Sequence, residues 1–161
     1  MVFRRIVNAS PLILLSKVGC LDFLRINADE LLVPEEVLVE IRAQGLDDPT
    51  VRVVEGTEWL KISPPSPIPE QVAAWNLGAG ESAVLALALS ERPCEVVLDD
   101  LAARRRATSA NILVRGTVGI VLLARREGLI PAARPVIDRL RRSGLFLTDS
   151  LAERMLALMG E

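Results

Sequence analysis

The sequence has 161 residues, of which 50% are hydrophobic, and a formal net charge of −2; it is long and apolar enough to form one well-filled domain. It contains no histidine, which excludes catalytic triads and zinc sites that depend on imidazole. Three Phe, two Trp and no Tyr are too few rings for a base-stacking platform of the RRM or OB type. Because the charge is nearly balanced, any nucleic-acid binding has to rest on a local basic patch.

Neither the cysteines nor the N-terminal segment indicate export. Cys20 and Cys94 are far apart and form no C-x-x-C pair, which is typical of reduced, buried cysteines in a cytoplasmic protein. Arg4 and Arg5 precede apolar residues, but the polar break at 8–11 interrupts the run that a signal peptide needs. No apolar run approaches the roughly 20 residues that span a bilayer. We therefore expect a cytoplasmic protein without membrane contact.

The first half of the chain predicts short strands that alternate with helices. Strands are expected over 3–7 and 31–33, and helices over 12–17 and 35–45. Pro11 and Pro34 suit the starts of these helices, and Gly45 ends the second. The turn at 47–49 then leads to two segments, 51–54 and 59–62, that read as short strands or extended loop. Four prolines between residues 63 and 69 predict an irregular connector.

The second half predicts the same alternation. Helices are expected over 81–91, 101–109, 117–127, 135–142 and 151–159, and strands over 95–98 and 112–114. Thr117 can cap its helix, and Ser150 with Glu153 forms a capping box for the last one. Residues 144–148 either add an edge strand or connect two helices. This alternation predicts a parallel sheet covered by helices on both faces, with its ligand site at the carboxyl ends of the strands.

Polar residues stand where such a sheet would place a ligand. Asn8 and Ser10 follow the first strand, Asp99 and Asp100 follow the strand 95–98, and Glu81 opens the helix before it. Each has a purely structural alternative, because Asn, Ser and Asp cap helices and a first-turn acid is favoured by the helix dipole. Together, however, they would supply the carboxylates and neutral oxygens that Mg²⁺ prefers. An ion held in this way can activate water and stabilise charge during displacement at phosphorus.

Two other features bear on the ligand. The glycines around Ala79 form neither a P-loop nor a dinucleotide-binding loop. Arg104, Arg105 and Arg106 follow the acidic pair, and further arginines occur at 115, 125 and 126. These arginines could hold a phosphate backbone, or they could lie on solvated helix faces and pair with acids.

Several of these segments resemble motifs of PIN domains. Residues 7–13 (VNASPLI) resemble the first-strand motif of that family, 78–82 (GAGES) its central acidic motif, and 99–104 (DDLAAR) its third motif. The run 116–120 (GTVGI) and the residues that follow it up to 130 narrow the resemblance to an uncharacterised PIN-like branch. That branch is related to VapC-type toxin ribonucleases.

The resemblance covers residues 6–156 and implies a fold, an activity and partners. It implies a single PIN-like domain over residues 1–161, built as a three-layer α/β/α sandwich with a parallel sheet of about five strands. It implies a Mg²⁺- or Mn²⁺-dependent endoribonuclease that serves as the toxin of a prokaryotic toxin–antitoxin pair. RNA would be the substrate, a small antitoxin protein the inhibitor, and the protein would form a homodimer.

The resemblance also assigns roles to individual residues. Asn8 falls at the first acidic position, Glu81 at the family's glutamate, Asp100 at the third acid with Asp99 beside it, and Thr117 at the fourth. We expect Asn8, Glu81, Asp99 and Asp100 to be catalytic and to bind the metal, and Ser10, Arg104 and Thr117 to bind substrate.

Two of these positions depart from the family pattern. Asn8 keeps a carbonyl oxygen but removes a negative charge, and Thr117 offers a hydroxyl where a carboxylate is expected. Fewer charged ligands weaken the binding of a divalent ion, which favours one metal over two. The alternative is therefore a catalytically weak or inactive PIN-like module that binds RNA or a protein partner.

Overall fold

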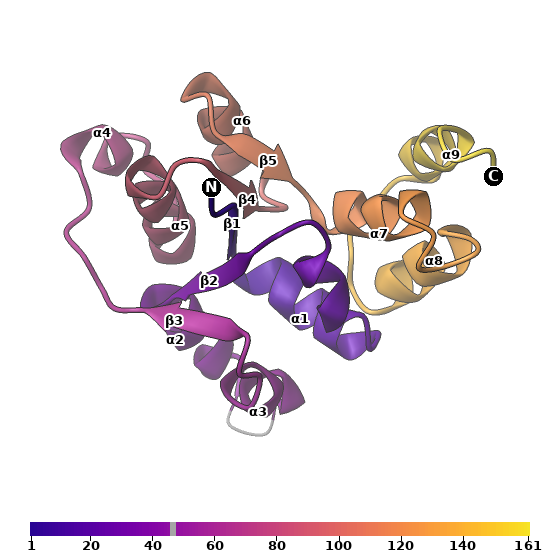
Figure 1. Ribbon diagram of the computed structural model, residues 1–161, viewed down its shortest axis with the longest axis horizontal. Helices are drawn as coiled ribbons and strands as arrows, with labels where there is room; N and C mark the ends of the chain where they lie inside the picture. Colours follow the sequence, from indigo (N-terminus) through magenta and orange to yellow (C-terminus); the bar gives the residue numbers. More distant parts are fainter. Residues whose placement is uncertain (46–47) are drawn as a thin grey trace.

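The computed structural model describes residues 1–45 and 48–161, and its centre is a parallel sheet (Figure 1). The described strands are β1 (Arg4–Val7), β2 (Glu30–Pro34), β3 (Leu60–Ser63), β4 (Cys94–Val97) and β5 (Leu113–Arg115). They form one five-stranded sheet in the order β3-β2-β1-β4-β5, and every neighbouring pair is parallel. The chain builds outward from β1 to β3 and then returns to add β4 and β5 on the other side. The strand order therefore reverses between β1 and β4, which is where open α/β sheets bind their ligands.

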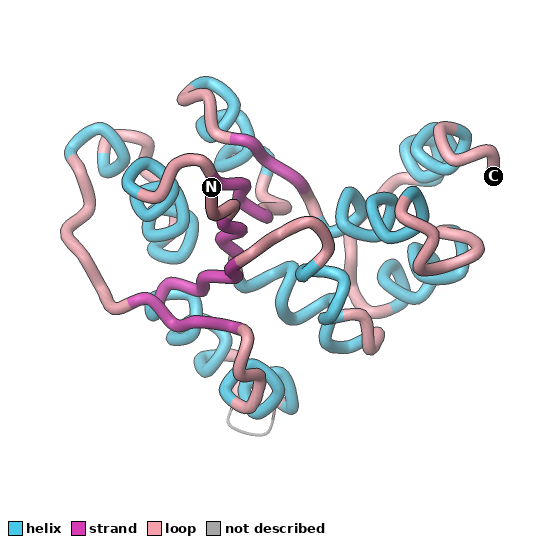
Figure 2. The backbone as a smooth tube through the Cα atoms, viewed as in Figure 1, coloured by secondary structure: helices cyan, strands magenta, loops and turns pink. Residues whose placement is uncertain are grey.

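Helices connect the strands and surround the sheet (Figure 2). They are α1 (Ala9–Lys17), the 3₁₀ helix η1 (Leu21–Arg25), α2 (Glu35–Ala43), α3 (Pro49–Glu55), α4 (Glu70–Ala73), α5 (Ala79–Ser90), α6 (Leu101–Ser109), α7 (Thr117–Arg126), α8 (Arg134–Arg142) and α9 (Asp149–Ala157). None of these helices is both long and apolar enough to cross a membrane. Figure 1 shows that α7, α8 and α9 group together beside α1, away from the edge strand β3.

The two faces of the sheet are covered by different helices. Helix α5 contacts β1, β2 and β4 and also packs against α2. On the other face, η1 contacts β2 and α7, and α7 contacts β5. All four residues of β4 are buried, as expected for a central parallel strand covered on both sides. The predicted three-layer α/β/α sandwich with a five-stranded parallel sheet is confirmed.

A charged network crosses the face of the sheet that η1 covers. Arg5 on β1 is 1% exposed, and its Nε donates to Glu95 Oε1 on β4 at 3.1 Å. Arg115 on β5 donates to the same oxygen at 3.0 Å. Arg5 Nη1 also donates to the carbonyls of Leu24 and Ile26 at 2.6 and 2.8 Å, which fastens η1 to the sheet. Burial lowers the pKa of Arg5, and the charge of Glu95 opposes that shift.

The segment 51–54 is helical, so the expectation of a strand or an extended loop there is wrong. Asp48 is the N-cap of α3, its carboxylate accepts from the Thr50 N–H at 2.8 Å, and Pro49 occupies the first helical position. Cap and proline start a helix more strongly than the β-branched residues of 51–54 favour a strand. The turn predicted at 47–49 begins at residue 47, which lies outside the described residues. The short helix α4 was not predicted.

Two predicted helix caps are also corrected. Helix α9 is capped by Thr148, whose hydroxyl accepts from the Leu151 N–H at 3.2 Å. Ser150 is the second residue of that helix, and Glu153 binds Arg134 instead of closing a capping box. Helix α7 has Gly116 as its N-cap, because the Thr117 hydroxyl is directed to Asp99. Residues 144–148 form no strand and connect α8 to α9.

Candidate active site at the carboxyl ends of β1, β4 and β5

Asn8 follows β1 and occupies the N-cap position of α1 without capping it. Its backbone N–H donates to the Val97 carbonyl at 3.1 Å, which continues the pairing of β1 with β4. Its side chain makes no capping hydrogen bond, and its Nδ2 instead donates to Glu81 Oε1 at a long 3.4 Å. The side chain is buried, and its Oδ1 has no hydrogen-bond partner among the described residues. A buried acceptor without a partner is costly, so this oxygen marks a place where a donor or a cation would bind favourably.

Asp99 follows β4 and gathers side chains from two neighbouring strand ends. Its Oδ2 accepts from the Ser10 hydroxyl at 2.9 Å and from the Thr117 hydroxyl at 2.6 Å. Its Oδ1 accepts from the Thr117 backbone N–H at 2.8 Å. Hydrogen bonds therefore link the polar residues that follow β1, β4 and β5. From the sequence, their proximity could be expected only because the carboxyl ends of parallel strands lie at the same edge of a sheet.

Asp100 has the structural role that the sequence left open for one member of the acidic pair. It is the N-cap of α6, and its Oδ2 accepts from the Ala103 N–H at 2.9 Å. Its side chain is exposed, whereas Asp99 is half-buried. Of the two adjacent carboxylates, Asp100 thus caps a helix and Asp99 accepts hydrogen bonds from Ser10 and Thr117.

Glu81 lies in the first turn of α5 and faces Asn8 across the switch point. Its only hydrogen bond within the described residues is the long one from Asn8, so most of the acceptor capacity of this carboxylate is unused. The carboxylate also lies so close to Gly78 that a Cβ on that glycine would come within 2.5 Å of Oε2. Glycine at position 78 therefore leaves the room that the Glu81 side chain occupies.

Glu40 is a further carboxylate at this place that the sequence interpretation missed. It lies on α2, and its Oε1 accepts from the backbone N–H of Gly80 at 2.7 Å, next to Glu81 in the chain. A Cβ on Gly80 would come within 2.6 Å of the same oxygen. A pattern search along the chain could not find this contact, because 40 residues separate the partners. The useful signal was the glycine before Glu81, which admits a second side chain.

Arg104 brings a positive charge to the edge of the site. Its Nη1 donates to the Leu98 carbonyl at 3.3 Å, and its guanidinium lies where a Cβ on Gly116 would contact it, so glycine at this position leaves room for the guanidinium. That Cβ would also lie 3.2 Å from Asp99 Oδ1, so the guanidinium and the carboxylate flank the same glycine. The cation is near the carboxylate without forming an ion pair with it among the described contacts, and it remains available to an anionic ligand.

The buried cysteines take no part in this site. Burial is the main reason why the pKa of both Cys20 and Cys94 is raised, so both thiols remain protonated at neutral pH. Cys20 lies beyond the end of α1 and Cys94 at the start of β4, the end of that strand opposite to Asp99. Because the thiolate is the nucleophilic form, neither Cys20 nor Cys94 is a candidate for a catalytic nucleophile.

The donor set suits a hard divalent cation held in part by water. Glu81 and Asp99 offer carboxylate oxygens and Asn8 a buried neutral oxygen, which are the ligand types that Mg²⁺ and Mn²⁺ accept. Across residues 1–45 and 48–161, however, no three Asp, Glu, Cys or His side chains converge closely enough to form a metal site by themselves. A cation here would keep several waters, which is usual for Mg²⁺.

The sequence agrees with a known family over nearly its whole length. A family model described as a PIN domain matches residues 4–161. The chain belongs to the PIN-domain family. This membership points to a nuclease-type function and to RNA as a ligand. No curated protein matches the sequence.

Proposed function

We propose that this PIN domain is a divalent-metal-dependent endoribonuclease. The observation that carries the proposal is the buried, unpartnered Oδ1 of Asn8 at the switch point, with Glu81 on one side and the Ser10–Asp99–Thr117 contacts on the other. Thr50 Oγ1 and Arg125 Nε are also buried without a hydrogen-bond partner among the described residues, but only Asn8 Oδ1 lies at the switch point. A buried polar oxygen without a donor is uncommon and needs an explanation. Binding of a hydrated cation supplies one.

The carboxylates have different roles in this proposal. Asn8 Oδ1, Glu81 and Asp99 would hold a Mg²⁺ or Mn²⁺ ion, which would stabilise the charge on the phosphate oxygens and acidify water. We assign this role to Asp99 rather than Asp100, because the Asp100 carboxylate caps α6. Both oxygens of Asp99 already accept hydrogen bonds, whereas Glu81 has free acceptor capacity. Glu81 therefore takes the proton from the attacking water.

Ser10, Thr117 and Arg104 position the reacting groups. The hydroxyls of Ser10 and Thr117 fix the Asp99 carboxylate in one orientation. Arg104 binds a phosphate of the substrate from its place beside Gly116, since a guanidinium pairs well with phosphate oxygens. Water attacks phosphorus and the bond to the 3′ oxygen breaks; that oxygen takes a proton from solvent water, which leaves a 5′-phosphate and a 3′-hydroxyl.

The direct test compares metal binding and RNA cleavage in the wild type and in Glu81→Gln. Titration calorimetry with Mn²⁺ measures binding, and a mixed RNA pool measures cleavage. The wild type should bind Mn²⁺ saturably and cleave, and Glu81→Gln should lose most of both. Glu58→Gln is a matched control, because Glu58 is an exposed carboxylate just before the far edge strand β3. Cleavage by Glu81→Gln at the wild-type rate contradicts the proposal.

A non-catalytic function has two observations in its favour. Within the described residues no set of three acidic, Cys or His side chains forms a metal site, and two positions carry Asn8 and Thr117 where the PIN pattern has acids. A module that binds RNA without cleavage would bind it equally well with and without EDTA, and a module that binds only a protein partner would not bind RNA. It would show no metal-dependent cleavage in folded protein freed from any co-purified partner.

The biological setting is a further part of the proposal. The resemblance to VapC-type toxins supports a cytoplasmic toxin that forms a homodimer and is inhibited by a small antitoxin protein. Expression of the wild type should then arrest bacterial growth, and expression of Glu81→Gln should not. Equal arrest by both proteins contradicts a toxic activity that depends on this site.

A further inference from the structure

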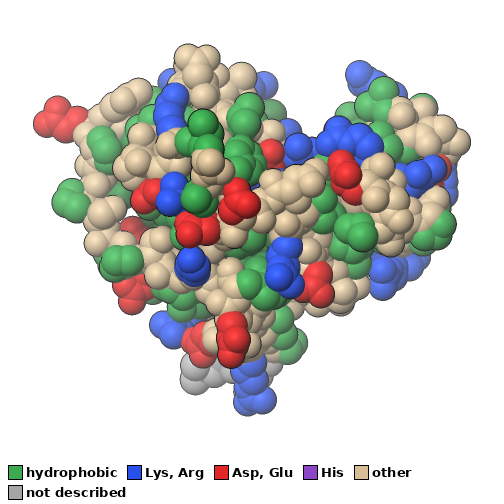
Figure 3. Space-filling view, viewed as in Figure 1, with side chains coloured by type: hydrophobic (Ala, Val, Ile, Leu, Met, Phe, Trp, Pro, Cys, Tyr) green, Lys and Arg blue, Asp and Glu red, His purple; other side chains and the backbone are tan. Residues whose placement is uncertain are grey.

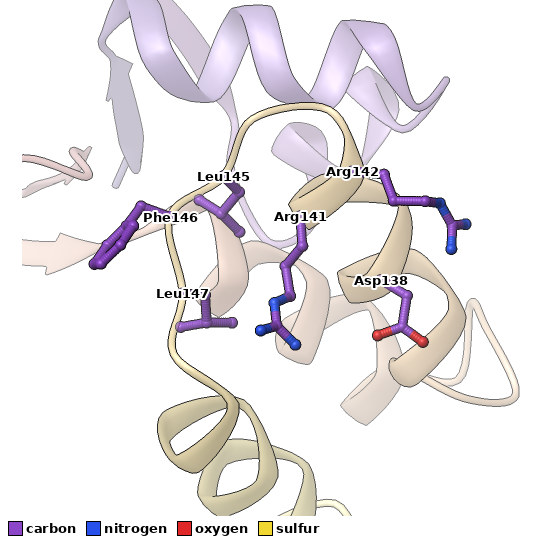
Figure 4. A pocket seen from close by; sticks show the side chains of 6 residues that line it. All are labelled: Asp138, Arg141, Arg142, Leu145, Phe146 and Leu147. Atoms are coloured by element: carbon purple, nitrogen blue, oxygen red, sulfur yellow. The ribbon is translucent and has the colours of Figure 1, made fainter.

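Phe146 is an aromatic side chain that the fold presents to solvent. It is 90% exposed, whereas Leu145 and Leu147 on either side pack against the hydrophobic core. The segment is fixed at both ends, since the Leu145 N–H donates to the Leu140 carbonyl at 3.0 Å and Thr148 caps α9. Figure 4 shows the Phe146 ring pointing away from α8. Leu145 and Leu147 thus anchor the segment and leave the ring between them outside the core.

Two cavities meet at this ring. One has a volume of about 480 Å³ and is lined by residues 145–147 together with Asp138, Arg141 and Arg142 of α8 (Figure 4). The other has about 410 Å³, is also lined by residues 145–147, and reaches Asp99 and Arg104 of the candidate active site. Figure 3 shows the surface hollowed between the part with α6 and β5 and the part with α8 and α9, with Lys and Arg side chains around the hollow. Phe146 therefore stands between a cavity that contains Arg142 and the cavity that ends at Asp99 and Arg104.

The charges on the two sides of the ring suit an anionic chain. Arg141 is paired with Asp149 at 2.5 Å, but Arg142 is exposed and has no ion pair with a described residue. On the other side, Arg104 is free of an ion pair among the described contacts. A ligand that complements this arrangement has a flat apolar group for the ring and negative groups before and after it. A nucleotide in a single strand has these features, because its base can stack while its phosphates meet arginines.

We propose that Phe146 stacks on an unpaired base of single-stranded RNA, whose backbone passes from Arg142 over the ring to Arg104 and Asp99. The inference rests on the proposed function, since it gives that site the path of its substrate. It requires one stacking ring rather than a platform of several, in keeping with the few aromatic residues of the chain. The arginines favour RNA over an apolar protein segment, which would cover the ring and leave these cations without partners.

The test measures binding of a fluorescently labelled single-stranded oligoribonucleotide by anisotropy in EDTA, so that the substrate stays intact. Phe146→Ala should weaken binding about 10-fold, Phe146→Leu should weaken it similarly, and Phe146→Trp should restore it, because only a ring can stack. Leu158→Ala is the control for loss of an exposed apolar side chain, since Leu158 is 77% exposed beyond the end of α9. Circular dichroism verifies that each variant is folded.

A reciprocal change in the RNA separates stacking from other effects. An oligonucleotide with abasic sites at the bound nucleotides should bind wild type and Phe146→Ala equally. Wild-type affinity of Phe146→Ala or of Phe146→Leu overturns the inference, as does a Phe146→Ala effect that persists on abasic RNA. A change of oligomeric state with unchanged RNA affinity overturns it in favour of a protein contact.

Failure of this inference is distinguishable from failure of the proposed function. If the wild type cleaves RNA with Mn²⁺ and Phe146→Ala binds RNA normally, only the role of Phe146 is wrong. If the wild type neither binds nor cleaves RNA, both proposals are wrong.

Discussion

Asp99 and Asp100 are chemically identical neighbours with different environments, and a matched pair of substitutions separates their roles. Asp99→Asn and Asp100→Asn remove the same charge one residue apart. We expect Asp99→Asn to lower metal-dependent cleavage about 100-fold or more, since loss of even an outer partner of a metal site commonly costs 10–100-fold. Asp100→Asn should cleave at nearly the wild-type rate, because its carboxylate caps α6 and does not join the Ser10 and Thr117 contacts.

The unfolding temperatures of the same variants test the two roles independently of cleavage. Asn caps a helix about as well as Asp, so Asp100→Asn should unfold at the wild-type temperature, whereas Asp100→Ala should lose about 1 kcal/mol. For a chain of this size, that loss lowers Tm by about 3 °C. Asp99→Asn should remain folded, because its amide oxygen still accepts from the Thr117 N–H and the two hydroxyls can rotate to accept from its amide nitrogen.

The assay is initial-rate cleavage of RNA with saturating Mn²⁺, with differential scanning fluorimetry on the same samples. Loss of cleavage in Asp100→Asn with full activity in Asp99→Asn refutes the division of roles. Equal large losses in both variants mean that Asp100 also contributes to the chemistry, and the assignment to Asp99 alone is then wrong.

Three further substitutions test individual contacts. Asn8→Asp adds a carboxylate beside Glu81 and should raise Mn²⁺ affinity in calorimetry by about 10-fold, because ligand charge governs affinity at such sites; weaker binding contradicts a metal at this oxygen. Thr117→Val removes the buried hydroxyl that donates to Asp99 and should cost about 1 kcal/mol in urea unfolding; an unchanged midpoint means that the hydrogen bond contributes nothing. Hydrogen bonds from the backbone N–H of Ala133, and to a smaller extent from that of Arg134, lower the pKa of Glu161. This carboxylate therefore stabilises the fold above its unfolded pKa, and the stabilisation is lost as the pH falls through its folded pKa. Wild type should therefore be more stable than Glu161→Gln at pH 7, and this difference should shrink as the pH falls below the ordinary range of a glutamate; a pH-independent difference contradicts this account.

The fold could be predicted from the sequence because its main signals are local. Short apolar runs such as 96–98 and the helix starts at Pro34 and Thr117 place strands and helices in an order that specifies a parallel sheet. The prediction for residues 51–54 was wrong because their β-branched side chains favour a strand, while the stronger signal, a helix start, lies upstream at Asp48 and Pro49. Thr148 rather than Ser150 caps α9, because two hydroxyl residues near the start of that helix could both serve and the sequence did not distinguish them.

The candidate site was predictable in its members but not in their contacts. The sequence indicated Asn8, Ser10, Glu81 and the acidic pair, because each follows a strand or opens a helix. It could not show which aspartate turns inward, since that depends on the direction in which the chain leaves β4. It also gave no sign of the contact between Glu40 and Gly80, which exists only because α2 packs against α5.

The nature of the RNA ends after cleavage tests the central claim most directly. Hydrolysis by water at this site leaves a 5′-phosphate and a 3′-hydroxyl and requires Mg²⁺ or Mn²⁺. Attack by the neighbouring 2′-hydroxyl of the RNA instead leaves a 2′,3′-cyclic phosphate and needs no metal. The account predicts 5′-phosphate ends that appear with Mn²⁺ and disappear with EDTA; cyclic phosphate ends, or cleavage that persists in EDTA, contradict it.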